Sequence, residues 1–251
     1  MIDLHSHILA GLDDGARTLD ESYEMARLAV AEGVTVVAAT PHVREDFPTS
    51  AGAMEEAVAE LNNDLAENDI DLEVVPGGEV DLEWLTRMSE DEKQRFSIAQ
   101  NGRYLLVEIP LVGWPLSLET QIFALRSAGV TPLLAHPERN SEVQANPPLI
   151  ERLVRGGARV QVTAASLDGR LGRRASQACR RLLDLGLVHV LASDAHAPDV
   201  RRGSLAQAVA ALRDDGLARY LTSDVPAAIV AGEPVPVRSV RERPRRRFIV
   251  F

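Results

Sequence analysis

Short runs of apolar residues alternate with longer amphipathic segments along most of the chain. The apolar runs are rich in β-branched residues and nearly uninterrupted, as is typical of strands in a parallel sheet that is buried on both faces. We predict strands at residues 2–5, 35–40, 72–75, 104–109, 131–135, 159–162 and 188–192. The segments between them carry apolar residues at helical spacing. We predict helices near residues 19–32, 53–68, 118–128, 148–155 and 173–185.

This strand–helix order, repeated seven times, predicts an α/β fold, either a parallel barrel or a doubly wound sheet. The acidic and polar segment 81–102 interrupts the order, and we interpret it as helices on the rim that could form a lid. A short helix is expected near 225–231. No linker rich in proline, glycine or serine is found, so we predict one domain over residues 1–251 with a basic tail at about 234–251.

The composition is that of a globular protein rather than a membrane or nucleic-acid-binding protein. The 251 residues are 45% hydrophobic, enough for a sizeable core, yet no apolar run reaches the length of about 18 residues that a membrane-spanning helix needs. There is no signal-peptide pattern, and the one cysteine cannot form an internal disulfide. The net charge of −10 opposes binding to phosphate backbones. We therefore predict a cytoplasmic protein without membrane insertion and without nucleic-acid partners.

The charge is unevenly distributed. The segment from Arg238 to Arg247 holds six arginines and one glutamate, and the apolar residues 248–251 follow it. This segment is either a solvated tail or edge strand, or a docking segment for an acidic partner or a second copy of the chain. A homo-oligomer is thus one of the open alternatives.

Histidines and acidic residues lie at the C-terminal ends of six of the seven predicted strands. His5 and His7 close the first strand, and residues two apart on a strand point to the same face. The ends of five other strands provide His42, Glu79, Glu108, His136, Asp194 and His196. Only the sixth strand, which ends near Thr163, provides none. Because the active site of an α/β barrel lies at this end of the strands, the pattern predicts a metal centre there.

The number and chemistry of these residues indicate the kind of centre. One ion needs only three or four protein ligands, so eight or nine candidates, Asp14 included, predict two or three ions that share carboxylates. Nitrogen and oxygen ligands without a thiolate favour Mn²⁺, Fe or Zn²⁺. Three divalent ions would bring six positive charges against four carboxylates, and the excess of two suits a phosphate monoester dianion. A metal cluster also supplies the activated water that this slow hydrolysis requires.

The sequence excludes the cysteine-dependent route to phosphate ester hydrolysis. Cysteine-dependent tyrosine phosphatases have an arginine six positions after the nucleophilic cysteine. Here Cys179 is followed at that distance by Leu185. Cys179 also lies in a helical pattern, so we interpret it as a small core residue.

Several motifs together resemble the PHP (polymerase and histidinol phosphatase) superfamily. They are Asp3-Leu4-His5-Ser6-His7, Thr40-Pro41-His42, the glutamate after the third strand, His136 and Asp194-Ala195-His196. Within it, three runs are similar to the bacterial manganese-dependent tyrosine phosphatases of capsular and exopolysaccharide biosynthesis. These are residues 5–16, His136-Pro137-Glu138-Arg139 and residues 192–196. The likeness extends from residue 1 to about residue 232.

The resemblance implies a distorted (β/α)7 barrel with three metal positions. The first would be held by His5, His7, Glu79 and Asp194. The second would take Asp14, His42 and His196, with Asp13 as the alternative to its neighbour. The third would take Glu108 and His136, with Glu79 bridging to the first. Arg139 and Arg201 would contact phosphate, Arg202 being the alternative to Arg201. His42 or His196, if not bound to metal, would protonate the leaving oxygen.

The resemblance further implies Mn²⁺ as the cofactor and the tail of a bacterial tyrosine kinase as the phosphotyrosine substrate. Two residues depart from the family pattern, Val43 after Thr40-Pro41-His42 and Asn140 after Arg139, and we expect both near the substrate mouth. A small-molecule phosphatase, such as histidinol-phosphate phosphatase, is the alternative within the superfamily. A metal-dependent nuclease or amidohydrolase is the alternative of another class, opposed by the acidic charge and by the lack of a lysine that could bridge two metals as a carbamate.

Overall fold

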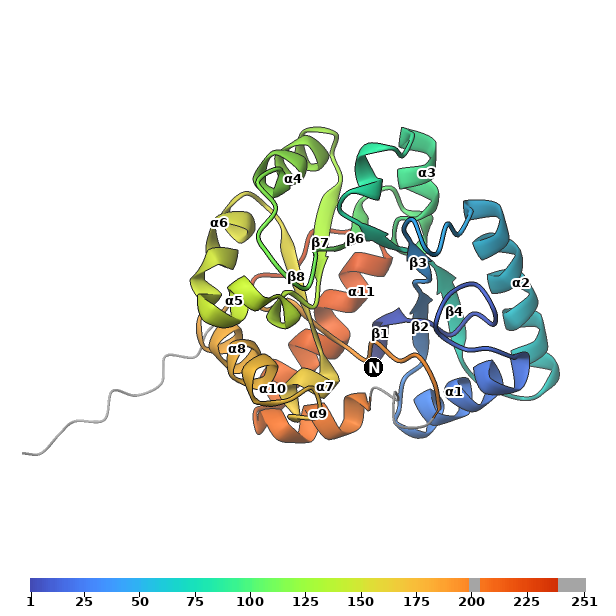
Figure 1. Ribbon diagram of the computed structural model, residues 1–251. Coiled ribbons are helices and arrows are strands. Elements are labelled where there is room, and N and C mark those ends of the chain that lie inside the picture. The colour runs from blue at the N-terminus through green and yellow to red at the C-terminus, as the bar shows by residue number, and fades with distance from the viewer. Residues whose placement is uncertain (199–203, 239–251) are drawn as a thin grey trace, which may run out of the picture.

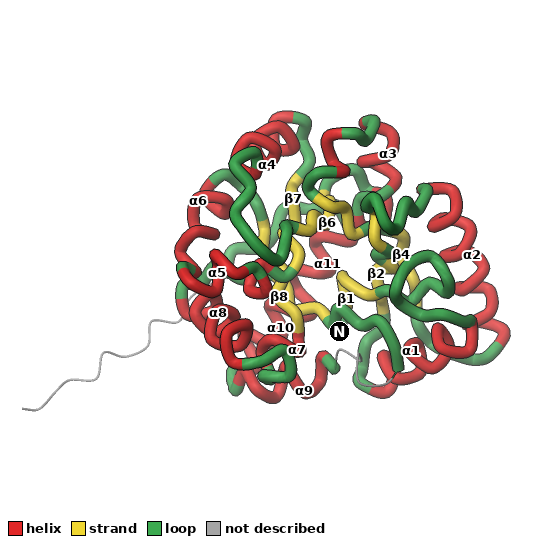
Figure 2. The backbone as a smooth tube through the Cα atoms, viewed as in Figure 1, coloured by secondary structure: helices red, strands yellow, loops and turns green. Residues whose placement is uncertain are grey.

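Parallel strands surrounded by helices form the framework of the protein. The computed structural model describes residues 1–198 and 204–238. The strands in this part of the chain are β1 (Ile2–Ser6), β2 (Val36–Ala39), β3 (His42–Val43), β4 (Glu73–Pro76), β5 (Glu79–Asp81), β6 (Tyr104–Glu108), β7 (Thr131–Ala135), β8 (Arg159–Thr163) and β9 (Val190–Ala192). Figures 1 and 2 show the strands in the middle of the molecule with helices around them. The α/β prediction is confirmed, and each predicted strand overlaps an observed one.

Helices connect the strands and cover their outer side (Figure 1). The α-helices are α1 (Leu19–Ala31), α2 (Ala51–Glu67), α3 (Glu90–Arg95), α4 (Leu118–Ser127), α5 (Ser141–Ala145), α6 (Ile150–Arg155), α7 (Ala164–Leu167), α8 (Arg173–Asp184), α9 (Leu205–Leu212), α10 (Asp215–Arg219) and α11 (Val225–Val230). Short 3-10 turns are η1 (Trp84–Thr86), η2 (Ile98–Gln100), η3 (Pro137–Arg139) and η4 (Pro147–Leu149), and η5 (Tyr220–Asp224) is a π-helical turn. The five predicted helices are confirmed, as is the short helix predicted near 225–231, which is α11.

The strand ladder is interrupted rather than continuously closed. Two parallel sheets have the orders β1-β2-β4 and β3-β5-β6-β7-β8-β9. The predicted second and third strands, at 35–40 and 72–75, are each followed by a short strand, β3 and β5, that was not predicted. Gly78, between β4 and β5, packs closely against Phe96, since a Cβ atom there would lie 2.6 Å from the ring. A parallel bridge between Ser6 and Ala195 brings the end of the first strand beside the end of the last.

The inner faces of the strands enclose a second apolar cluster, separate from the one under the outer helices. Leu4, Leu106 and Leu133 contribute from the strands, and Val225 and Ile229 of α11 pack against them. In Figure 2, α11 lies behind the strands. The helix thus fills the inside of the strand arrangement away from the strand ends that carry the histidines.

The segment 81–102 contains the predicted helical turns, but its last part is not on the rim. Ile98 of η2 is fully buried in the inner cluster, and Phe96 is buried in the outer one. This part is built into the core, as its apolar side chains require. Among the described residues, no helix has the length and apolar composition that crossing a membrane requires.

The face on which His5 and His7 lie depends on an irregularity in β1. Ile2 and Leu4 pack into the inner cluster, so regular alternation would turn His5 and His7 outward. The pairing of β1 with β2 shifts register between Asp3 and Ser6. A shift of one residue exchanges the two faces of a strand, which brings both imidazoles to the inside.

Candidate metal centre

Four buried side chains from three strand ends surround one point. The Nε2 atoms of His5 and His7 are 3.2 Å apart. Oε2 of Glu79 lies 3.3 and 3.4 Å from them, and Oδ1 of Asp194 lies 3.5 and 3.6 Å from them. Donor atoms held about 2.1 Å from one ion in tetrahedral geometry lie about 3.4 Å apart. The four atoms therefore have the spacing of the ligands of one divalent ion.

Two further buried side chains fix the tautomers of these histidines. Oε1 of Gln161 accepts a hydrogen bond from the backbone N–H of His136 and lies 3.1 Å from Nδ1 of His5. Oδ2 of Asp13 lies 2.6 Å from Nδ1 of His7 and accepts from the backbone N–H of His42 at 2.9 Å. Both oxygens are acceptors, so each Nδ1 carries the proton and each Nε2 presents a lone pair to the centre.

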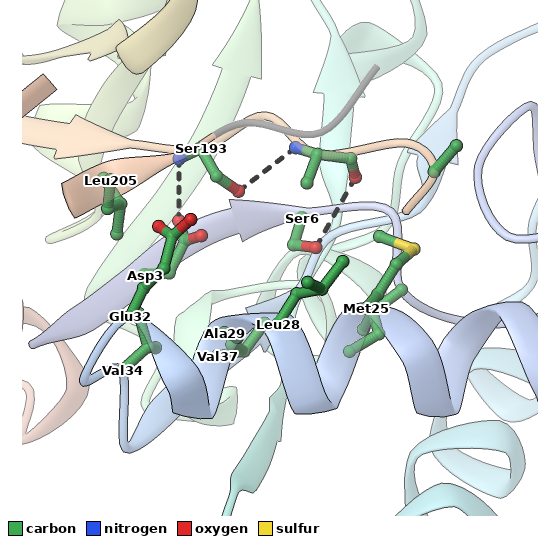
Figure 3. A pocket seen from close by; sticks show the side chains of 13 residues that line it. Asp3, Ser6, Met25, Leu28, Ala29, Glu32, Val34, Val37, Ser193 and Leu205 are labelled. Carbon is green, nitrogen blue, oxygen red and sulfur yellow. Dashed lines mark hydrogen bonds between the residues drawn. The ribbon is translucent and has the colours of Figure 1, made fainter. Parts of the chain in front are cut away.

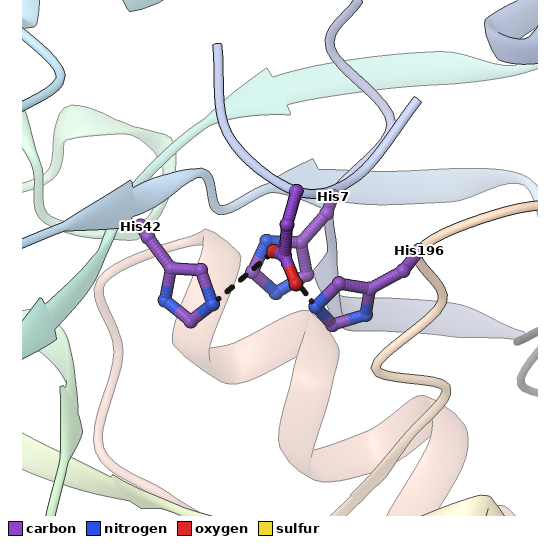
Figure 4. A group of neighbouring side chains, drawn as sticks. His7, His42 and His196 are labelled. Atoms are coloured by element: carbon purple, nitrogen blue, oxygen red, sulfur yellow. Dashed lines mark ion pairs between the residues drawn. The ribbon is translucent and has the colours of Figure 1, made fainter. Parts of the chain in front are cut away.

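A second group lies on the open side of the first. Oδ1 of Asp14 is 3.4 Å from Nε2 of His196 and 3.6 Å from Nε2 of His42. Figure 4 shows the His42 and His196 rings on either side of His7, with these two ion pairs dashed. The carboxylate of Asp14 faces this group, while that of Asp13 is turned to the backbone and to His7. Of the two neighbours, the geometry favours Asp14 as the residue that reaches the centre.

The third group adjoins Glu79. Nε2 of His136 lies 2.9 Å from Oε1 of Glu79 and 3.9 Å from Oε1 of Glu108. Nδ1 of His42 lies 3.0 Å from Oε2 of Glu79 and 3.8 Å from Oε2 of Glu108. Each oxygen of Glu79 thus faces a different set of nitrogens, as a bridging carboxylate would. The ring of His42 thus lies between the second and third groups. The assignment implied by the family resemblance places His42 in the second group alone.

The electrostatics of the centre call for cations. Burial disfavours the charged form of Glu79, yet His5, His136 and His42 hold the pKa of this carboxyl well below its usual range. Burial would lower the pKa of His5, but Glu79 and Asp194 raise it to about 9. Burial and the charge of Glu79 raise the pKa of Glu108. Because the carboxylates draw protons onto the imidazoles, divalent ions would replace these protons.

Several buried atoms support the same conclusion. Nδ1 of His136 has no hydrogen-bond partner among the described residues, and Oε2 of Glu79 and Oδ1 of Asp194 have only ion-pair contacts with imidazole nitrogens. An uncompensated buried polar atom is costly, and a charged one more so. All nine residues predicted as ligands fall into sets whose donor atoms lie within 4.8 Å of one another. The residues present therefore fit a centre of more than one ion.

Arg139 extends this centre toward solvent. Its Nη1 donates to Oδ2 of Asp194 at 2.8 Å, and its side chain is 29% exposed. Arg139 is the last residue of η3, the turn that directly follows His136. His136 itself has a left-handed φ of 30°. That strained turn aims both side chains at the centre. Arg201 and Arg202 lie outside the described residues, so their predicted role stays a prediction.

Comparison with known proteins gives the family of the chain. A model of the capsular polysaccharide synthesis family CpsB/CapC matches residues 1–229. The chain belongs to the CpsB/CapC family. Tyrosine-protein phosphatase YwqE of Bacillus subtilis is 39% identical over 197 residues, which cover 78% of this chain and 77% of that protein. The putative tyrosine-protein phosphatase CapC of Staphylococcus aureus is 33% identical over 198 residues, with the same coverage of each chain.

A solved structure extends the likeness to three dimensions. A crystal structure from a study of YwqE from Bacillus subtilis and CpsB from Streptococcus pneumoniae superposes with a TM-score of 0.85 at 33% identity. These two proteins are described as metal-dependent tyrosine phosphatases. The match covers 95% of this chain and all of that one. The CpsB/CapC fold thus accounts for the strand arrangement that brings the nine residues together.

The sequence did not single out several residues that the structure of this CpsB/CapC member places at the centre. Gln161 comes from β8, the strand predicted to provide no metal ligand. Asp13 was predicted only as an alternative ligand, whereas here it contacts Nδ1 of His7. Arg44 lies 3.4 Å from Glu108, and the ring of Phe47 stacks beside His42. Asp13 could have been indicated by its place beside Asp14, whereas nothing in the sequence indicates the role of Gln161.

Val43 and Asn140, expected near the substrate mouth, are both buried, so neither side chain is exposed there. Val43 is 1% exposed and packs in the core. Asn140 is also 1% exposed, caps α5 by accepting from two backbone N–H groups, and donates to the carbonyls of Pro110 and Gly113. Asn140 therefore ties the loop after β6 to the segment that carries Arg139.

A separate cavity lies outside β1, away from the centre. Its volume is about 40 Å³, and it is lined mainly by apolar side chains of α1 and the neighbouring strands, as Figure 3 shows. Asp3 borders it and accepts from the backbone N–H groups of Ser193 and His5. Burial raises the pKa of Asp3 to about 6. Asp3 thereby joins the first strand to the residue that precedes Asp194.

Cys179 plays no part in the centre. It is fully buried in α8, and burial raises the pKa of its thiol well above the usual value. A buried, protonated thiol is a poor nucleophile. The interpretation of Cys179 as a core residue is confirmed.

Proposed function

We propose that the protein is a metal-dependent phosphatase that hydrolyses phosphotyrosine in a protein substrate. The carrying observation is the nine-residue cluster of nitrogen and oxygen donors, with Arg139 at its open side. The family and its phosphatase relatives support the substrate class. We further propose Mn²⁺ as the ion, a bacterial tyrosine kinase as the substrate protein, and the cytoplasm as the location. We also propose that the chain forms one domain with a basic tail, and that it can form a homo-oligomer.

We propose nine ligands for the centre. They are His5, His7, Asp14, His42, Glu79, Glu108, His136, Asp194 and His196. Glu79 would bridge, since both of its oxygens face imidazole nitrogens. Bound divalent ions would lower the pKa of water to generate a nucleophile and would neutralise phosphoryl oxygens.

The chain's own side chains would orient the ester. Arg139 presents a planar guanidinium, whose geometry suits two phosphoryl oxygens, and Arg201 would add a second. The tyrosine oxygen has an ordinary pKa of about 10 and leaves more readily when it is protonated. His196 is 15% exposed on the open side, so His196, or His42 beside it, is the residue proposed to deliver this proton if it is not itself bound to metal.

The test combines metal analysis with hydrolysis of a phosphotyrosine peptide. We expect two or three ions per chain, activity with Mn²⁺, and loss of activity on chelation and in His136→Ala. His189→Gln, which changes a histidine outside the centre, is the control and should keep both metal and activity. Activity that survives chelation or His136→Ala would overturn the proposal. A higher kcat/KM for histidinol phosphate would instead support the small-molecule alternative.

A further inference from the structure

We infer that Phe47, held in place by Arg44, selects the aromatic ring of an aryl phosphate at this site. The inference rests on the proposed phosphatase function and adds to it the residue that distinguishes aryl from alkyl esters. Phe47 would be a specificity-determining residue, and Arg44 a positioning residue.

The first observation is the direction from which substrate can approach. The side chains of His5, His7 and Glu79 are fully buried. Among the groups of the centre, exposure is greatest for Asp14 at 42%, Arg139 at 29% and His196 at 15%. Solvent, and hence a phosphate ester, reaches the centre from this side.

Phe47 stands next to the centre as a half-buried ring. Its centroid lies 5.9 Å from that of His42, with 18° between the two planes. His42 in turn contacts Glu79 and Asp14. A phosphoryl group bound at the centre would therefore carry its ester substituent within reach of Phe47.

The backbone around Phe47 is fixed. Arg44 and Phe47 exchange two backbone hydrogen bonds, of 3.1 and 3.2 Å, and Val43 and Pro48 form an antiparallel bridge around them. This is a tight hairpin turn that begins directly after β3. A ring on such a turn is positioned before substrate arrives, which lowers the entropic cost of binding.

Arg44 joins the turn to the centre. Its guanidinium lies over the Phe47 ring at 5.2 Å, contacts Oε2 of Glu108 at 3.4 Å and Oδ1 of Asp46 at 2.8 Å. The Arg44 guanidinium thereby orients both the Phe47 ring and Glu108, a proposed metal ligand. The planar guanidinium of Arg44 therefore lies beside the Phe47 ring.

The chemistry fits an aryl ester better than an alkyl one. Aromatic rings attract each other beyond the effect of area burial, by an amount that corresponds to about tenfold in affinity. An alkyl phosphate offers no ring for this contact. We therefore expect Phe47 to favour aryl over alkyl ligands about tenfold.

Binding of two phosphonates to the Mn²⁺-loaded protein tests this directly, because neither ligand is hydrolysed. Titration calorimetry would give the Kd of phenylphosphonate and of methylphosphonate. We expect the preference for phenylphosphonate to fall about tenfold in Phe47→Leu, to be retained in Phe47→Tyr, and to fall less in Arg44→Gln. Phe123→Leu is the matched control, since Phe123 is 71% exposed on the outer helix α4.

Kinetics provide the second measurement. In Phe47→Leu the KM for a phosphotyrosine peptide should rise about tenfold with a smaller change in kcat, and metal content and melting temperature should be unchanged. An unchanged phosphonate preference in Phe47→Leu, or no preference in the unmodified protein, would overturn the inference. Absence of phosphotyrosine hydrolysis alongside an intact preference would overturn the proposed function and leave this inference standing.

Discussion

Supporting side chains decide which nitrogen each histidine turns toward the proposed ions. Gln161 and Asp13 each combine a backbone hydrogen bond with a contact to an imidazole Nδ1. The backbone bond fixes the oxygen, and the oxygen fixes the tautomer. At the scale of the residue, the centre is therefore built from two layers of side chains, of which the inner one is proposed to hold the ions and the outer one orients it.

Replacing Gln161 should weaken metal binding without unfolding the protein. In Gln161→Leu, His5 loses its Nδ1 acceptor, and the loss of such a partner typically costs 10- to 100-fold in metal affinity. Competition with a chromophoric chelator would measure the Mn²⁺ affinity, and circular dichroism would verify the fold. Gln121→Leu on α4 is the control and should bind as the unmodified protein does. Equal affinity in Gln161→Leu would contradict the role given to Gln161.

The sequence predicted the ligands better than it predicted their supports. The spacing of His5 and His7 correctly placed them on one face, but the register shift in β1 determines which face, and no residue type announces it. Gln161 looks like an ordinary polar residue in a strand. Its role depends on the His136 backbone, 25 residues away, which only the folded chain brings near.

At the scale of the element, the pairing of neighbouring strands depends on side chains outside the centre as well. His189, which precedes β9, accepts a hydrogen bond at Nδ1 from the backbone N–H of Val160 in β8. The acceptor must be unprotonated. Burial, together with the charge of Arg159, lowers the pKa of His189 to about 4.

Stability should therefore fall as the pH falls through the range from the ordinary histidine pKa of about 6.5 to about 4. Above this range His189 is neutral in both states. Within it the unfolded chain binds the proton first, so acid favours unfolding. Between pH 7.5 and pH 5 the contribution is about 2 kcal/mol. Denaturant unfolding of the unmodified protein and of His189→Gln at both pH values measures it. If the difference between the two proteins does not change with pH, the assignment to His189 is wrong.

The apolar pattern predicted the elements but not their interruptions. The second strand was expected as one unit at 35–40, yet the pairing passes from β2 to β3 across Thr40 and Pro41. Gly78, between β4 and β5, packs against Phe96, which lies in a later segment of the chain. Such breaks arise from contacts between elements, so periodicity within one element cannot show them.

At the scale of the whole molecule, the two ends of the strands have opposite character. Leu4, Leu133 and Ile229 fill one end, and the proposed metal centre occupies the other. The sequence predicted the chemical end because strand ends in an α/β fold share one side. It did not predict that α11 fills the apolar end, because the pattern near residue 225 indicates a helix but not its partner.

The metal end should therefore contribute to the stability of the whole fold. Without ions, Glu79 and Asp194 stay buried beside imidazoles that must take up protons. At a free Mn²⁺ concentration 100-fold above the Kd, binding would stabilise the folded state by about 2.7 kcal/mol. For a chain of this length that corresponds to roughly 5–10 °C in melting temperature.

A chelator titration followed by differential scanning calorimetry measures this shift. We expect the melting temperature to fall as metal is removed and to recover on adding Mn²⁺. Glu79→Gln should abolish the response, because both of its oxygens are proposed to bridge ions, whereas His189→Gln should retain it. A melting temperature that stays constant while the bound metal is lost would show that the centre forms without the help of its ions, contrary to the charge balance inferred from its buried carboxylates.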